Sequence, residues 1–171
     1  MIRRSSALLL AAALPLSALA APPHVHGIAS LDVAVDGNTL SLHLESPMEN
    51  LVGFEHPAYD PAQKEALNRL LAQLRRPAEL FVPTPAAGCV PGKPMLASSL
   101  FGTPDKTFNQ HGHADLDADF AFNCAHPEQL TGLEVRLIPV FPRTHRVNVQ
   151  IAGPKGQAAV RLEAGNTHVG L

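Results

Sequence analysis

The sequence predicts an α+β fold: a mostly antiparallel β-sheet of about six strands with one main helix packed on one face. Short segments in which apolar and polar residues alternate recur along the chain, as they do in half-buried strands. Asp36-Gly37, a typical hairpin turn, separates the first two of these segments. Only one segment has strong helical spacing of its apolar residues, so a single helix is expected to cover the sheet.

The N-terminus has the features of a cleavable export signal. Arg3 and Arg4 precede an apolar run over residues 7–16, and Ala18-Leu19-Ala20 fits the small-residue pattern of a cleavage site. The run is shorter than the roughly 20 apolar residues that span a bilayer, which argues against a retained anchor. We therefore expect residues 1–20 to be removed and the protein to work outside the cytoplasm.

The remaining residues, 21–171, have the length of one domain with its own hydrophobic core. The chain has 13 Lys and Arg, and loss of Arg3 and Arg4 leaves 11 basic side chains against 15 acidic ones. This weakly acidic balance offers no basic patch for nucleic acid. No further apolar segment is long enough to insert into a membrane.

The first predicted unit is a β-hairpin. Residues 28–35 place Leu31, Val33 and Val35 on one face, and residues 39–45 alternate in the same way. The following segment, residues 46–59, is expected to be a loop because it contains proline and glycine.

The main helix is predicted to begin at Asp60-Pro61, with the aspartate as N-cap and the proline at the first helical position. Its apolar stripe consists of Leu67, Leu70, Leu71 and Leu74. Pro77 is expected to end the helix, and residues 80–82 to form a short strand.

The rest of the chain begins with a long loop, residues 83–112, rich in proline and glycine. Loops of this length in a compact domain are often functional. Residues 114–124 alternate cleanly, with Leu116 and Phe120 facing one way and Asp117 and Asp119 the other. Three further strands are expected at residues 133–141, 146–151 and 158–162.

Cys89 and Cys124 are the two cysteines of the chain, and an even number in an exported protein indicates one disulfide. The alternatives are a thiolate metal site or a redox pair, but no C-x-x-C motif is present. In the chain-entropy model a bridge over this loop would stabilise the fold by roughly 3–4 kcal/mol.

The histidines are the most informative residues for function. Nine are present, and two pairs have H-x-H spacing, His24 with His26 and His111 with His113, while His56 follows Glu55. In an extended chain, residues two apart point to the same side, so each pair can offer two imidazoles to one ion. Zinc binds neutral imidazole nitrogens in tetrahedral groups of three or four ligands, with carboxylates such as Glu55 often orienting the rings.

Other side chains are expected to have simpler roles. The isolated histidines are interpreted as surface or hydrogen-bonded core residues: His43, His126, His145 and His168. The acidic face of residues 115–119 is interpreted as solvated, with a calcium site as the alternative. The chain has no H-E-x-x-H helix and no G-x-S-x-G elbow, two common signatures of hydrolases.

Several motifs together resemble the ZrgA-like periplasmic zinc-binding proteins. They are His24-Val25-His26-Gly27, Leu44-Glu45-Ser46-Pro47, Asn50-Leu51-Val52-Gly53-Phe54-Glu55-His56, Ala87-Gly88-Cys89 and His113-Ala114-Asp115. The match continues with residues 120–124, Phe141-Pro142, Val149-Gln150 and residues 153–157. The resemblance covers essentially residues 21–171. It implies a periplasmic protein of Gram-negative bacteria that binds Zn²⁺ and assists its uptake.

Carried over by position, the resemblance implies that His24, His26, His56 and His113 are metal ligands, with Glu55 and His111 as lesser candidates. It also implies that Cys89 and Cys124 are the cysteine pair of the family. Members often carry a run of His, Asp and Glu between the first cysteine and the H-A-D segment. Residues 90–110 contain no histidine here, so one binding site is expected rather than a loop that collects several ions.

We therefore expect a zinc-binding protein, not an enzyme, that holds one Zn²⁺ and passes it to an uptake transporter or another periplasmic protein. A zinc hydrolase with Glu55 as general base is the first alternative. A metal-free interaction domain with histidines on its surface is the second. Copper and nickel also accept imidazole, so the preference for zinc is not encoded in residue type alone.

Overall fold

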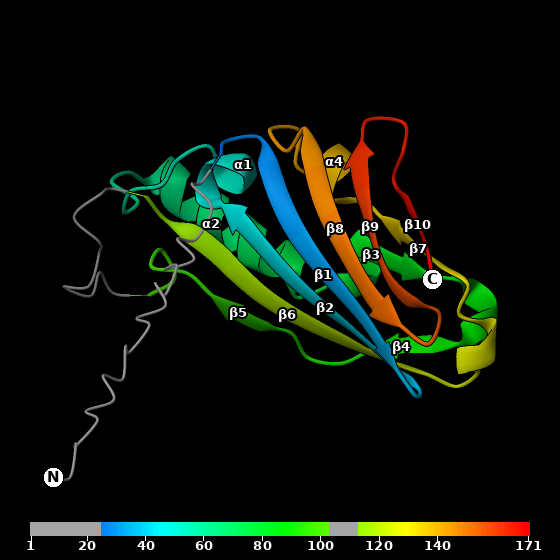
Figure 1. The fold of residues 1–171 in the computed structure, drawn as a ribbon. Helices are drawn as coiled ribbons and strands as arrows, with labels where there is room; N and C mark the ends of the chain where they lie inside the picture. Colours follow the sequence, from blue (N-terminus) through cyan, green and yellow to red (C-terminus); the bar gives the residue numbers. More distant parts are fainter. Residues whose placement is uncertain (1–24, 103–112) are drawn as a thin grey trace, which may run out of the picture.

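The computed structural model describes residues 25–102 and 113–171. Its main feature is a twisted seven-stranded sheet, ordered β4-β6-β2-β1-β8-β9, with β5 also paired to β6 (Figure 1). The strands are β1 (Ile28–Asp36), β2 (Thr39–Pro47), β4 (Cys89–Pro91), β5 (Met95–Ala97), β6 (Asp115–Cys124), β8 (Arg146–Gly153) and β9 (Gly156–Glu163).

A second, smaller sheet has the order β10-β7-β3. Its strands are β3 (Phe81–Pro83), β7 (Gly132–Val135) and β10 (His168–Gly170). The helices are α1 (Met48–Val52), α2 (Pro61–Leu74), α3 (Pro77–Leu80) and α4 (Leu137–Val140), with 3-10 turns at Pro85–Ala87 and Pro127–Gln129. Among the helices of the described residues, none has the length and apolar character needed to cross a membrane.

The core lies between the large sheet and the elements behind it. Figure 1 shows α2 and the small sheet on the same side of the large sheet. The strands alternate buried and exposed residues, and Phe81 of β3 packs on Phe120 of β6 with ring centroids 5.0 Å apart. Each large apolar side chain buried here contributes about 1.5–3 kcal/mol relative to exposure.

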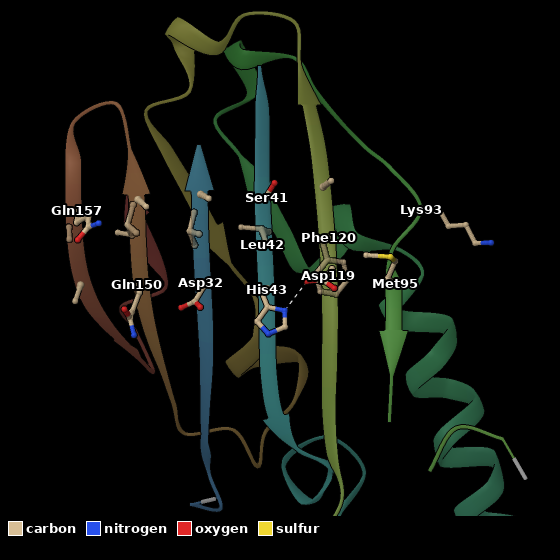
Figure 2. Close-up of a pocket in the computed structure, with 17 residues that line it drawn as sticks. Asp32, Ser41, Leu42, His43, Lys93, Met95, Asp119, Phe120, Gln150 and Gln157 are labelled. Atoms are coloured by element: carbon tan, nitrogen blue, oxygen red, sulfur yellow. Dashed lines mark hydrogen bonds and ion pairs between the residues drawn. The ribbon is translucent and has the colours of Figure 1, made fainter. Parts of the chain in front are cut away.

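The other face of the large sheet is polar and open. A broad depression of about 1030 Å³ lies over it, lined by residues of β1, β2, β6, β8 and β9 (Figure 2). Polar side chains at alternate positions, such as Asp32, His43 and Gln150, line this depression. The face therefore remains available to solvent and solutes.

Helix α2 confirms the expectation from its sequence. The Asp60 carboxylate accepts a hydrogen bond from the Gln63 backbone N–H at 2.8 Å, and Pro61 is the first helical residue. Leu67, Leu70 and Leu74 are buried, as the apolar stripe predicts. The helix already ends at Leu74. Pro77, which was expected to end it, instead begins the short helix α3.

The prediction of a mostly antiparallel sheet of about six strands is only partly right. Strands β1 and β8 pair in parallel over seven residue pairs, so the large sheet is mixed, and it has seven strands. Hairpins such as β1–β2 must be antiparallel because two residues join their strands. A long stretch of chain separates β8 from β1, so β8 can run in either direction relative to β1. The alternation of apolar and polar residues is the same in both directions and cannot predict which one is adopted.

Three local predictions also need correction. Residues 46–59, expected as loop, contain α1, and residues 83–102 contain β4 and β5. Residues 133–141, expected as one strand, form β7 and then α4, where the Phe141 N–H donates to the Leu137 carbonyl at 2.8 Å. A continuous apolar run cannot distinguish a strand from a buried helical turn, which explains this error.

The predicted disulfide is confirmed. Cys89 on β4 and Cys124 at the end of β6 are direct partners in the antiparallel register, and their sulfurs are bonded. The bridge closes a sequence separation of 35 residues. It ties the long connection after β3 to the central strand β6.

Replacement of both cysteines with serine should lower the free energy of unfolding by about 3–4 kcal/mol, because the open chain regains loop entropy on unfolding. Urea denaturation of the oxidised protein and of the double variant measures this difference. Reduction of the wild type should give a similar loss. Equal midpoints for all three samples would show that the bridge does not stabilise the fold.

Candidate metal site

The topology brings three sequence motifs to one end of the large sheet. Strand β2 is antiparallel to both β1 and β6, so its C-terminal end lies beside their N-terminal ends. His26 comes just before β1, Glu55 follows the helix after β2, and His113 comes just before β6. Residues far apart in the sequence therefore meet there.

A buried asparagine connects two of these motifs. Asn50 on α1 is 1% exposed, and its Oδ1 accepts a hydrogen bond from the Gly27 backbone N–H at 2.6 Å. Its Nδ2 donates to the Ile28 carbonyl at 3.0 Å and to Ser46 Oγ at 3.2 Å. Asn50 thus fixes the turn after His26 against α1. Asn50 was not among the residues predicted to be functional, although it opens the motif that contains Glu55 and His56.

Two glycines shape the backbone on either side of this contact. Gly27 and Gly53 have φ values of +83° and +85°, in the left-handed region that favours glycine. A Cβ on Gly27 would lie 2.9 Å from the His145 ring, and a Cβ on Gly53 would lie 2.9 Å from the Arg143 guanidinium carbon. Both turns therefore require glycine, and both pack against the segment just before β8.

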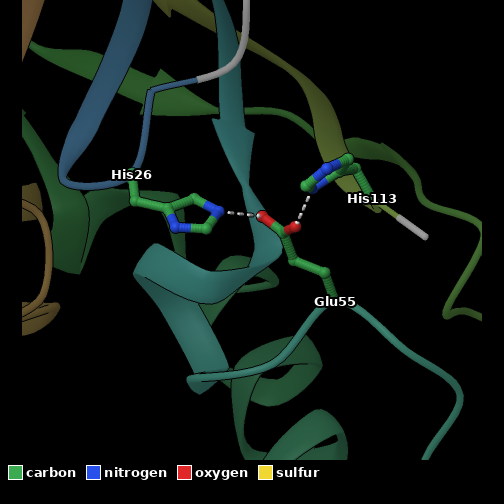
Figure 3. A group of neighbouring side chains, drawn as sticks. All are labelled: His26, Glu55 and His113. Atoms are coloured by element: carbon green, nitrogen blue, oxygen red, sulfur yellow. Dashed lines mark hydrogen bonds and ion pairs between the residues drawn. The ribbon is translucent and has the colours of Figure 1, made fainter. Parts of the chain in front are cut away.

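Glu55 contacts both histidines at the centre of the site. Its Oε1 lies 3.1 Å from His26 Nε2, and its Oε2 lies 2.6 Å from His113 Nδ1 (Figure 3). The two imidazole rings are 6.3 Å apart between centroids. One ligand atom from each residue lies within 4.8 Å of the others, which is close enough for all three to share one metal ion.

Burial differs sharply within this group. The Glu55 side chain is 9% exposed, whereas those of His26 and His113 are 56% and 51% exposed. A buried carboxylate needs hydrogen bonds or a counter-charge, and the two imidazole N–H groups supply hydrogen bonds here. Ligand atoms around tetrahedral zinc are separated by roughly 3.3 Å, given Zn–N distances near 2.0–2.1 Å. The 3.1 Å contact of Glu55 with His26 is close to that spacing, and the 2.6 Å contact with His113 is shorter.

The other predicted ligands are placed differently. His56 is outside this group, because its Nδ1–H donates to the Pro57 carbonyl at 2.9 Å and its ring stacks between Phe54 and Tyr59. His24 and His111 lie outside the described residues. Glu55, a lesser candidate from the sequence, is the residue that His26 and His113 both contact.

A second group that could hold a metal lies on the open face of the large sheet. It consists of His43, Glu45 and Asp117. His43 looks isolated in the sequence, and only strand pairing shows its neighbours. The hydrogen bond that His43 donates to the Asp119 carboxylate raises the pKa of His43 above its ordinary value. Partial burial opposes this shift, and Glu45 adds to it.

Comparison with known families matches residues 23–171 to the ZrgA family zinc uptake protein model. The chain belongs to the ZrgA family of zinc uptake proteins. The match includes all three motifs of the site, and it confirms the resemblance seen in the sequence. No curated protein matches the chain. Membership of the ZrgA family thus connects this protein to zinc uptake, and the His and Glu groups are where a metal could be held.

His43 should titrate at a higher pH than an ordinary histidine, because the Asp119 carboxylate stabilises its charged form. Its small contribution to stability should therefore be complete below about pH 6.5 and disappear as pH rises through the raised pKa. Imidazole chemical shifts followed by NMR measure this. Asp119→Asn should lower the pKa more than Glu45→Gln. Equal titration curves for wild type and Asp119→Asn would contradict the assignment.

Proposed function

We propose that this protein is a periplasmic zinc-binding protein that holds one Zn²⁺ at the His26–Glu55–His113 group and assists zinc uptake. The carrying observation is the convergence of these side chains, from three separate motifs, to within 4.8 Å. The ligand atoms would be His26 Nε2, His113 Nδ1 and a Glu55 oxygen. Both nitrogens contact Glu55 through their N–H groups, and the ion would replace these protons. Two imidazoles and a carboxylate are typical zinc donors.

The partial exposure of the group supports a carrier rather than a structural site. Structural zinc is usually enclosed by four protein ligands, whereas three ligands leave one position open. With His26 and His113 half-exposed, a donor group from a receiving protein can reach the ion. His24, two residues before His26, remains the sequence-based candidate for a fourth protein ligand, with His56 and His111 also retained as predictions.

The arrangement favours binding over the alternative of a zinc hydrolase. A general base must accept a proton from a metal-bound water. Both oxygens of Glu55 instead contact the imidazoles that would ligate the metal. Glu55 is thus placed as a ligand or an orienting group.

We infer that the protein acts in the periplasm after removal of residues 1–20. The Cys89–Cys124 disulfide fits an oxidising compartment, and zinc uptake family membership fits a role in delivering the ion to a transporter. The domain would comprise residues 21–171. Zinc itself is the cargo, and the protein would release it rather than use it in a reaction.

His26→Ala and His113→Ala should each weaken zinc binding by about 100-fold or more, because each removes one of three ligands. Glu55→Gln should also weaken binding, since it removes the only negative charge in the group. Competition with a chromophoric chelator measures the affinities. His126→Ala is the matched control, because this exposed histidine belongs to neither three-residue group of the described chain. Wild-type affinity in both site variants would contradict the proposal.

Zinc affinity should fall as the pH decreases through about 6.5, because protons then compete for the imidazole nitrogens. The competition assay repeated between pH 7.5 and 5.5 measures this. A buffer series at constant ionic strength is required to exclude salt effects. An affinity that stays constant over this range would rule out a histidine-based site.

A further inference from the structure

We propose a second, weaker site for a divalent first-row transition metal such as zinc on the open face of the large sheet. Its ligands would be His43 Nε2 and carboxylate oxygens of Glu45 and Asp117. One ligand atom from each of these residues lies within 4.8 Å of the others. The site is separate from the proposed uptake site, with which it shares no residue.

The strand register builds this group. In the antiparallel pairing of β2 with β6, His43 is opposite Asp119 and Glu45 is opposite Asp117. Residues two apart on a strand share a face, so all four side chains lie on the side away from the core. The burial patterns agree, since these positions alternate with the buried Leu44 and Ala118. A central pair of strands therefore holds the donors rigidly.

Asp119 orients the imidazole for metal binding. His43 Nδ1 lies 2.8 Å from Asp119 Oδ1, so the Nδ1–H donates to this carboxylate (Figure 2). The other nitrogen, Nε2, lies 3.4 Å from Glu45 Oε1. A carboxylate that accepts one N–H of a histidine fixes the tautomer whose other nitrogen ligates metal. Asp119 is therefore a positioning residue, while Glu45 stands on the ligand side of the ring.

The charges around the ring also favour a cation. Glu45 and Asp117 are directly opposite each other across two strands, and like charges in that position destabilise a sheet. Asp32 lies opposite His43 on β1, so carboxylates flank the imidazole from both neighbouring strands. Lys93 lines the same depression, but Figure 2 shows its side chain extending away from the sheet. A divalent ion among these groups would remove the repulsion.

The imidazole determines which ion fits. A purely acidic face is normally solvated, and calcium or magnesium prefers oxygen ligands alone. One imidazole with two carboxylates suits zinc, copper or nickel. His43, Glu45 and Asp119 are 39%, 61% and 51% exposed, so their charges are well hydrated and binding should be weaker than at the buried Glu55. The alternative occupant is a proton on Nε2, and the experiment must separate the two.

The experiment uses the His26→Ala/His113→Ala double variant, which lacks both histidine ligands of the proposed uptake site and keeps only Glu55 of that group. Calorimetric titration with zinc should still show one binding event, weaker than that of the wild type. Addition of His43→Ala should weaken this event by about 100-fold, and addition of Asp119→Asn by about 10–100-fold. The ¹⁵N shift of His43 Nε2 should change on zinc addition, which a proton-only role would not produce at constant pH.

Addition of His126→Ala to the same background is the matched control and should leave zinc binding unchanged, because this exposed histidine pairs with Glu128 and belongs to neither three-residue group of the described residues. Thermal melts will show that the exposed substitutions leave the fold intact. The proposal is overturned if the double variant binds no zinc, or if His43→Ala leaves its binding unchanged. Either result is independent of the uptake site, which is tested by the difference between wild type and double variant.

Discussion

The hydrogen bonds of Asn50 are the interaction on which the geometry of the site depends. One side chain amide joins the backbone at Gly27 and Ile28 to α1 and to Ser46. Each bond is buried or partly buried, so loss of the amide would leave polar backbone groups without partners at a cost of about 1–3 kcal/mol each. These bonds, together with the direct contact of His26 with Glu55, hold the turn after His26 beside the segment that carries Glu55.

This dependence explains why the two glycines accompany the asparagine. Gly27, whose N–H donates to Asn50, has its backbone in the left-handed region, and Gly53 ends α1 in the same region. The segment before β8 then packs over both glycines through His145 and Arg143. Polar contacts and close packing therefore fix the turn at Gly27, helix α1 and the segment before β8 relative to one another. The candidate metal-binding side chains next to these segments are positioned by the same contacts.

Local structure could be predicted from the sequence where it depends on neighbouring residues. The β1–β2 hairpin, the N-cap at Asp60 and the alternation of residues 114–124 all rest on contacts within a few positions. The parallel pairing of β8 and the helix α4 could not be predicted, because they depend on how distant segments pack. The same limit applies to Asn50, whose backbone partners at Gly27 and Ile28 lie more than 20 residues away.

The candidate sites show this limit in their individual residues. His26, Glu55 and His113 could be named from the sequence because each lies in a motif. His56 lies in the same motif as Glu55, but it contacts Pro57, Phe54 and Tyr59 and not the other two histidines. His43 carries no motif and looked isolated, since its partners Asp117 and Asp119 come from a strand more than 70 residues later. Sequence spacing can show that two donors share a face. Only the register of paired strands shows which donors meet across it, and that register is set by burying the apolar face of the sheet. The packing of the core thus decides the composition of both groups, although neither group is part of it.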